Sequence, residues 1–183
     1  DFKPDYGMAT VCGHAAVQGN RIGIVTNNGP LDPAGSTKAT HFIQACCQSG
    51  LPLVYLQNTT GYIVGTESER GGMIKHGSKM IQAVANASVP QVTIQCGASY
   101  GAGNYGMCGR GFAPRFLFSW PNARTAVMGA EQAASVLVQV KRDQLAREGK
   151  ELSKDEAAAI ATPVLEKYER EGSPYYSTAR LWD

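Results

Sequence analysis

Short apolar runs rich in β-branched residues alternate with longer segments of helical periodicity along this chain. The run 51–58 (LPLVYLQN) is nearly continuously apolar, which is typical of a strand buried on both faces. Residues 90–96 (PQVTIQC) are predicted to form another buried strand. Helices are predicted at 36–50, with Ser36 as the N-cap, and from Met73 onward. Strands and helices that alternate in this order predict an α/β fold in which helices cover a parallel sheet.

Local signals place the other elements of the first two thirds of the chain. Gly19-Asn20 is a hairpin turn signal, and it joins strands predicted at 10–18 and 21–28. Two further short strands are predicted at 115–120 and 123–128.

The last third of the chain is predicted to be helical. One helix covers 131–148, and its inward face is predicted to carry Val136, Leu137 and Val140. Ser153 and Glu156 have the spacing of a capping box that opens another helix. Thr162 and Pro163 are read as the N-cap and first residue of a restarted helix.

Charge and cysteine content narrow the function classes. Charged residues make up 17% of the chain, against roughly 25% in an average protein, which predicts a large interface with a partner. A net charge of +2 does not indicate nucleic acid or an acidic membrane surface as a partner. No run reaches the ~18 apolar residues of a membrane span, and the N-terminal residues lack a targeting pattern. Five cysteines, mostly within apolar runs, indicate a reducing compartment rather than a disulfide framework.

Two glycine-rich segments, 59–72 and 97–111, follow the two buried strands. Ligands of such folds bind beyond the carboxyl ends of the strands, so these segments are the predicted site. A helix that begins near Gly103 would leave its first N–H groups unpaired at the positive end of the helix dipole, where they could hold an anionic oxygen. Glycines that merely allow close helix packing are the alternative interpretation.

The spacing Gly101-x-Gly103-x-x-Gly106 also satisfies a dinucleotide-binding pattern. That pattern should open directly from a strand, whereas four residues separate it here from Cys96. It also requires an acidic residue about 20 positions later for the ribose, and 110–130 contains none. Both features argue against a dinucleotide-binding oxidoreductase.

Side chains suited to acid–base or metal chemistry are sparse. The three histidines, His14, His41 and His76, have no evident orienting carboxylate, and no Gly-x-Ser-x-Gly elbow is present. No pair of cysteines or histidines has metal-ligand spacing, so no metal is expected in this domain. Chemistry at the glycine-rich segments is therefore expected to rest on backbone donors, with a cofactor or substrate supplying the reactive group.

The stretch from GYIVGTESERGG through QCGASYGAGNYGMCGRG, followed by PRFLFSWPNARTAVMGAEQAASVL, resembles the carboxyltransferase (β) subunit of biotin-dependent acyl-CoA carboxylases. The resemblance runs along almost the whole chain and corresponds to the C-terminal half of such a subunit. AGNYGMCGR and PYYSTARLWD are similar to the methylcrotonyl-CoA and geranyl-CoA branch. This resemblance implies a crotonase-like fold of repeated ββα units.

The resemblance also implies a reaction and a set of site residues. The reaction is carboxyl transfer from carboxybiotin to a β-methyl α,β-unsaturated acyl-CoA, with the substrate proton leaving the γ carbon. The main-chain amides of Ala102 and Gly103 would hold the oxygen of a biotin enolate, and Tyr105 would contact the acyl chain. The residues implied to line the biotin pocket are Gly61, Tyr62, Gly71, Gly72 and Gly101.

Partners and location follow from the same resemblance. Residues 1–183 would be the biotin-side domain, and the acyl-CoA half of the subunit would be absent, so the isolated fragment is expected to be inactive. Expected partners are the N-terminal half of the carboxyltransferase subunit, a biotin-carrying α subunit and further copies of the chain. The implied location is the bacterial cytoplasm or the mitochondrial matrix. A non-catalytic assembly domain and another crotonase-like acyl-CoA enzyme stay open as alternatives.

Overall fold

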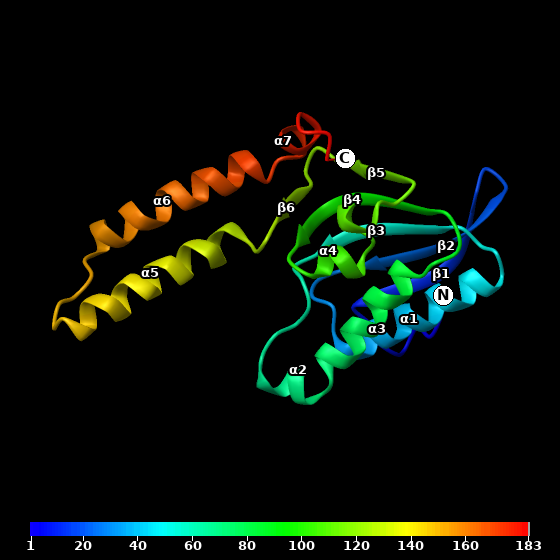
Figure 1. Ribbon diagram of the computed structural model, residues 1–183, viewed down its shortest axis with the longest axis horizontal. Coiled ribbons are helices and arrows are strands. Elements are labelled where there is room, and N and C mark those ends of the chain that lie inside the picture. Colours follow the sequence, from blue (N-terminus) through cyan, green and yellow to red (C-terminus); the bar gives the residue numbers. More distant parts are fainter. Residues whose placement is uncertain (183) are drawn as a thin grey trace.

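A six-stranded sheet is the centre of the computed structural model, which describes residues 1–182 (Figure 1). The strand order is β1-β2-β3-β4-β5, and β6 pairs with the end of β4 beyond β5. Only β1 and β2 are antiparallel among the described strands, and the other pairs are parallel. The strands are β1 (Thr10–Val17), β2 (Asn20–Asn27), β3 (Leu53–Thr59), β4 (Gln91–Tyr100), β5 (Phe116–Ser119) and β6 (Arg124–Ala126). The predicted α/β fold with a parallel sheet is confirmed.

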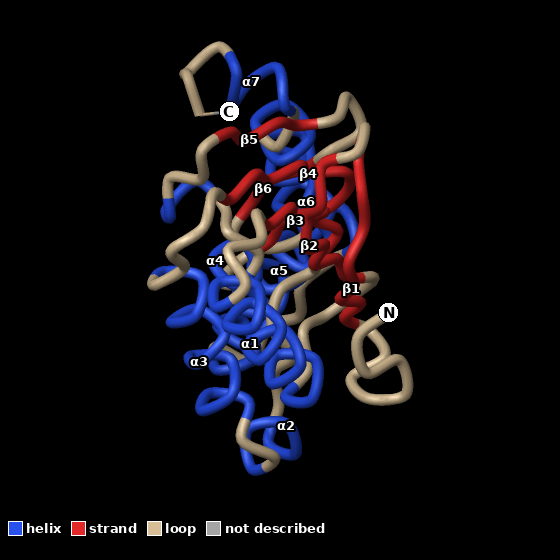
Figure 2. The backbone as a smooth tube through the Cα atoms, turned by 90° about the vertical axis from the view of Figure 1, so that its right-hand side faces the viewer, coloured by secondary structure: helices blue, strands red, loops and turns tan. Residues whose placement is uncertain are grey.

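Two helices, α1 (Pro33–Gln48) and α3 (Met73–Ala85), lie on the same side of the sheet (Figure 2). The strand residues that face them are fully buried, for example Val25 and Tyr55. Phe42 of α1 and Met80 of α3 are buried in the same core. Burial of large apolar side chains contributes about 1.5–3 kcal/mol each, so this layer carries most of the fold's stability.

The opposite face of the sheet is apolar but only partly covered. Ile24, Val54, Val92 and Phe116 lie in register across four strands, and each is half-buried or exposed. The prediction that the strands are buried on both faces therefore holds on one face only among the described residues.

The ends of the first elements differ from the prediction by one to three residues. The hairpin turn consists of Gln18 and Gly19, both with positive φ, because this backbone matches the twist of the two strands. Helix α1 begins at Pro33, and the Asp32 side chain caps it by accepting a 2.5 Å hydrogen bond from the Gly35 N–H. Asp at the N-cap followed by Pro is a strong start signal, so Ser36 lies inside the helix.

Helices α5 (Ala130–Arg147) and α6 (Lys154–Glu171) form a hairpin that projects away from the sheet (Figure 1). The prediction that one face of α5 points into a core is wrong, because periodicity shows which residues share a face but not whether anything covers it. Val136, Leu137 and Val140 on this face are 53%, 48% and 61% exposed, respectively.

Helix α6 begins as predicted and then continues past its proline. The Ser153–Glu156 capping box is present with both of its hydrogen bonds. The predicted restart at Thr162 and Pro163 is wrong, since Pro163 lies inside α6. Pro163 is exposed, so water can reach the backbone carbonyl that has lost its N–H partner. No described helix is long and apolar enough to cross a lipid bilayer.

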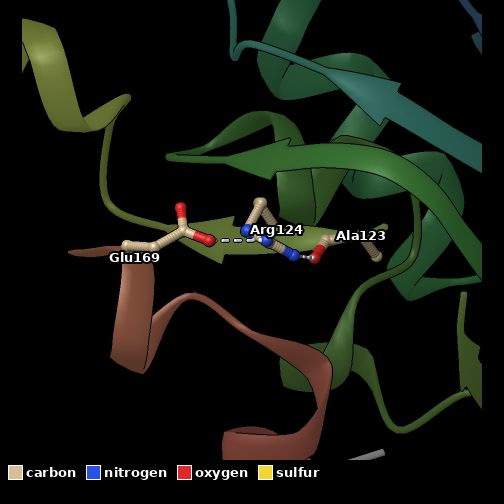
Figure 3. Close-up of polar contacts among 3 residues, drawn as sticks. All are labelled: Ala123, Arg124 and Glu169. Carbon is tan, nitrogen blue, oxygen red and sulfur yellow. Dashed lines mark hydrogen bonds and ion pairs between the residues drawn. The ribbon is translucent and has the colours of Figure 1, made fainter. Parts of the chain in front are cut away.

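The helical hairpin is tied to the sheet through β6 (Figure 3). The Arg124 guanidinium of β6 forms a 2.8 Å ion pair with Glu169 of α6 and donates a second hydrogen bond to the Ala123 carbonyl. The Thr125 N–H donates to the carbonyl of Gly172, which follows α6. An exposed ion pair of this kind contributes at most about 1 kcal/mol to stability, so its role is mainly to fix the direction of the helical hairpin.

Candidate active site

The turn that follows β4 carries the predicted anion-binding residues. Strand β4 runs to Tyr100, four residues further than predicted, so Gly101 follows it directly. The prediction that four residues separate the strand from Gly101 is therefore wrong. The one-turn helix α4 (Gly103–Gly106) begins where the glycine pattern predicted. Helix α4 is only four residues long, so its dipole is small. A dinucleotide site would need a longer helix at this position.

Two adjacent main-chain N–H groups in this turn have no hydrogen-bond partner among residues 1–182. The N–H groups of Asn104 and Tyr105 donate to the carbonyls of Gly101 and Ala102, at 3.2 and 3.1 Å. Among the residues that the structure describes, the N–H groups of Ala102 and Gly103 donate to no backbone or side-chain acceptor. Gly101 has φ +56°, a conformation that a side chain would strain, and it reverses the chain just before these donors.

A cavity of about 490 Å³ adjoins this turn. Ala102 is exposed at its wall, while Gly103 is buried behind it. Tyr105 also lines the cavity and packs edge-on against Phe112, with 5.9 Å between ring centroids. Other lining residues include Gly101, Asn104, Arg110 and Trp182. No Asp, Glu or His is among the described lining residues, so the polar groups that this wall offers are main-chain groups, neutral side chains and the Arg110 guanidinium.

The two glycine-rich segments meet through close backbone contacts. A Cβ on Gly103 would lie 2.8 Å from the Gly61 Cα and 2.9 Å from the Thr59 Oγ1. A Cβ on Gly106 would collide with the Tyr62 hydroxyl. These distances are shorter than real Cβ contacts, so glycine is what lets the segments approach. The interpretation that the glycines allow close packing and the interpretation that they expose N–H donors therefore apply to the same turn.

The remaining predicted residues of segment 59–72 lie elsewhere. Tyr62 lines a separate apolar cavity of about 300 Å³ beside Met73, and burial raises the pKa of its phenol well above the usual value. Gly71 is exposed and Gly72 half-buried between α2 (Thr66–Arg70) and α3, and neither is among the residues lining these two cavities. The structure thus brings together Gly101, Ala102, Gly103 and Tyr105, with Gly61 and Tyr62 behind them.

A buried polar network beneath α4 was missed by sequence reasoning. The Gln57 side chain donates a 2.6 Å hydrogen bond to the Met107 carbonyl and accepts one of 2.5 Å from the Ser99 hydroxyl. Ser99 in turn accepts a 2.7 Å hydrogen bond from the Asn104 amide. The available signal was a glutamine inside the apolar run LPLVYLQN, since a buried polar side chain must have partners.

The three histidines are not among the described residues that line the cavity at Ala102. His76 forms a 3.0 Å hydrogen bond with Thr37, His41 accepts one from Lys3, and the His14 ring packs on Phe42. His41 and His76 line a groove of about 890 Å³ between α1 and α3. That groove is larger than the cavity at Ala102, but volume alone does not identify a site. The turn that carries the unpaired N–H groups adjoins the smaller cavity. No metal-binding cluster of three His, Cys, Asp or Glu occurs in residues 1–182.

Comparison with known proteins gives a consistent set of relatives. The carboxyl transferase domain family matches residues 1–183. The probable mitochondrial methylcrotonoyl-CoA carboxylase beta chain of Drosophila melanogaster is 55% identical over 183 residues, which are the whole of this chain and 32% of the relative. The crystal structure of the P. aeruginosa geranyl-CoA carboxylase beta subunit superposes with a TM-score of 0.92 at 52% identity, covering 100% of this chain and 34% of that one.

A more distant structure has the same fold. Transcarboxylase 12S, described as a hexamer with hydrolyzed methylmalonyl-coenzyme A bound, superposes with a TM-score of 0.84 at 33% identity, over 98% of this chain and 34% of that one. The crotonase-like fold is thereby confirmed. The chain spans about a third of the length of the curated relatives that it matches.

Proposed function

The chain belongs to the carboxyl transferase domain family, and from this we propose that it is the carboxybiotin-binding part of the carboxyltransferase subunit of an acyl-CoA carboxylase. The observation that carries the proposal is the pair of adjacent N–H groups, at Ala102 and Gly103, that have no acceptor beside a cavity. Such donors stabilise a negatively charged oxygen more than a neutral one.

The substrate class in this proposal is a β-methyl α,β-unsaturated acyl-CoA. Support comes from the names of the relatives, which are a methylcrotonoyl-CoA carboxylase and a geranyl-CoA carboxylase, at 55% and 52% identity. Transcarboxylase 12S, whose title names methylmalonyl-coenzyme A, is only 33% identical. The exposed face of Tyr105, at the wall of the cavity, is the surface we assign to the acyl chain.

The residues around the cavity fit biotin as the cofactor. Biotin carries a small neutral ureido ring whose oxygen accepts hydrogen bonds, and the turn offers two donors with no competing acceptor. Carboxybiotin, when bound, supplies the activated carboxyl group. The N–H groups of Ala102 and Gly103 would hold the ureido oxygen and favour negative charge on it, and Gly61 supports that turn from behind. No carboxylate or imidazole of the described residues lines the cavity, so this chain orients the reactants rather than moving the proton.

Partners and compartment are part of the same proposal. We propose that the acyl-CoA half of the subunit, a biotin-carrying α subunit and further copies of the chain complete the enzyme. The chain spans about a third of the length of the Drosophila relative. The hexamer of transcarboxylase 12S supports an oligomer. The Drosophila relative is named as mitochondrial, which supports the matrix for a eukaryotic source, and the cytoplasm corresponds to it for a bacterial one.

The test is removal of one N–H in the full-length subunit assembled with its biotin-bearing partner. Ala102 has φ −68°, which matches the fixed φ of proline, so Ala102→Pro deletes the donor without changing φ at this position. Carboxylation of 3-methylcrotonyl-CoA and geranyl-CoA should fall by about 10²–10³-fold, the usual loss for one such donor. Ala102→Ser keeps the N–H and should stay within a few-fold of the wild type.

Two results would count against the proposal. A folded Ala102→Pro enzyme with undiminished carboxylation would remove the assigned role of the N–H. A wild-type complex that assembles but carboxylates neither thioester would favour the non-catalytic assembly domain instead.

A further inference from the structure

Helix α4 is too short to hold its own geometry. A single helical turn is unstable by itself, because nucleation fixes several residues for one hydrogen bond. The direction of the unpaired N–H groups at Ala102 and Gly103 must therefore come from contacts outside the turn. Glycine packing against Gly61 limits how far the turn can move, but apolar contact alone does not fix its rotation.

The buried side chain of Gln57 supplies directional contacts at both ends of this turn. Its Nε2 donates to the carbonyl of Met107, the residue that ends α4. Its Oε1 accepts from Ser99 Oγ, which accepts from Nδ2 of Asn104, the second residue of α4. The three hydrogen bonds form a relay from Asn104 through Ser99 and Gln57 to Met107.

The relay has one consistent arrangement of hydrogens. The single Ser99 hydroxyl hydrogen goes to Gln57, so the Ser99 oxygen can only accept from Asn104. The Gln57 amide nitrogen must then face Met107, because a carbonyl cannot donate. Each of the three side chains is thus held by at least one hydrogen bond, and hydrogen-bonded buried networks make a structure rigid.

We propose that Gln57 is a positioning residue that sets the direction of the Ala102 and Gly103 N–H groups through this relay. The inference rests on the proposed function for its kinetic consequence. Gln57 has no exposed surface and is not among the residues lining the cavity, so it acts only through the residues it holds. Ser99 and Asn104 do line the cavity, and they connect it to Gln57.

The experiment compares two variants of neighbouring residues on β3 in the full-length subunit within its complex. Gln57→Met keeps an unbranched side chain of similar length but removes both hydrogen bonds. Tyr55→Phe is the matched control, because it removes one hydrogen bond, to Gln91, from a buried side chain on the same strand and the same face. If Gln57→Met does not fold, Ser99→Ala breaks the relay at its middle with the loss of one oxygen.

Two readouts separate positioning from stability. In Gln57→Met the kcat for carboxylation should fall by about 10–10²-fold, the size of effect that a misplaced group causes, with the KM for acyl-CoA within about twofold. Deuterium exchange of the amides of 104–107 should become several-fold faster. Tyr55→Phe should change neither of them, even if it lowers the thermal midpoint.

Each other outcome overturns the inference. Unchanged exchange at 104–107 would show that the relay does not hold the turn. An unchanged kcat, or a raised KM alone, would show that the held geometry does not matter for transfer. If the wild-type complex carboxylates nothing, the proposed function fails, while the exchange experiment still decides whether Gln57 fixes the turn.

Discussion

Gly103 packs directly on Gly61, so that a Cβ on Gly103 would lie 2.8 Å from the Gly61 Cα. One glycine comes from the segment after β4 and the other from the segment after β3. Their contact joins the two glycine-rich segments at the carboxyl ends of neighbouring parallel strands, which is where ligands of α/β folds bind.

Gly103→Ala should lower both stability and activity. Residue 103 does not have a positive φ, so the cost arises from the contact alone, and backbone on the Gly61 side must move. Overpacking of this kind costs about 1–3 kcal/mol of unfolding free energy. Denaturant unfolding and carboxylation by the assembled enzyme are the measurements.

Gly13→Ala on β1 is the matched control for this substitution. A Cβ there would meet nothing closer than 3.6 Å, and alanine is favoured over glycine in strands, so stability should stay equal or rise slightly. Equal effects of the two substitutions would contradict the importance of the Gly61–Gly103 contact.

The capping box of α6 should make local stability depend on pH. Hydrogen bonds from the Ser153 hydroxyl and N–H lower the pKa of Glu156 below its usual value. A group whose pKa is lowered by folding stabilises above its unfolded pKa, about 4.3, and loses this contribution as pH falls through the folded pKa. The thermal midpoint of the wild type should therefore exceed that of Glu156→Gln at pH 6, and the difference should shrink as the pH falls below about 4.3. A constant difference across that range would contradict this origin.

Three buried thiols should resist alkylation in the native protein. Burial raises the pKa of Cys12 to about 12 and the pKa values of Cys46 and Cys108 to about 11. All three are at most 1% exposed, so at pH 8 they are both protonated and covered. Mass spectrometry after iodoacetamide treatment should find them unmodified in buffer and modified in guanidinium chloride. Native modification of Cys12 or Cys108 would show that the core opens readily.

The fold was predictable where local chemistry decides it. A capping box needs only Ser153 and Glu156 at the right spacing. The buried parallel strands are recognisable in the sequence from their apolar residues. The start of α1 was misplaced because two residues compete as caps, and Asp32 followed by Pro33 prevails over Ser36. The exposed Val136 on α5 could not be foreseen, since amphipathicity does not reveal what covers a helix.

The candidate site was predictable only in its main chain. The glycine pattern gave the start of α4 at Gly103, because glycines mark close backbone approach. The sequence did not separate Gly71 and Gly72 from Gly61, since all belong to one segment and only the packed structure shows which of them reaches Gly103. The role of Gln57 depends on a hydrogen bond to a residue 50 positions later, which no local pattern encodes.

An alanine scan does not measure the contribution of a site that is made of backbone N–H groups. Position 102 is already alanine, and every amino acid except proline brings the same N–H there. Alanine substitution would thus report damage at Gln57 or Asn104 through the lost side chain and at Gly103 through the contact with Gly61, but it would leave both assigned N–H groups in place. Amide-to-ester replacement at positions 102 and 103, by semisynthesis, is the direct way to measure how much each of these N–H groups contributes to carboxylation.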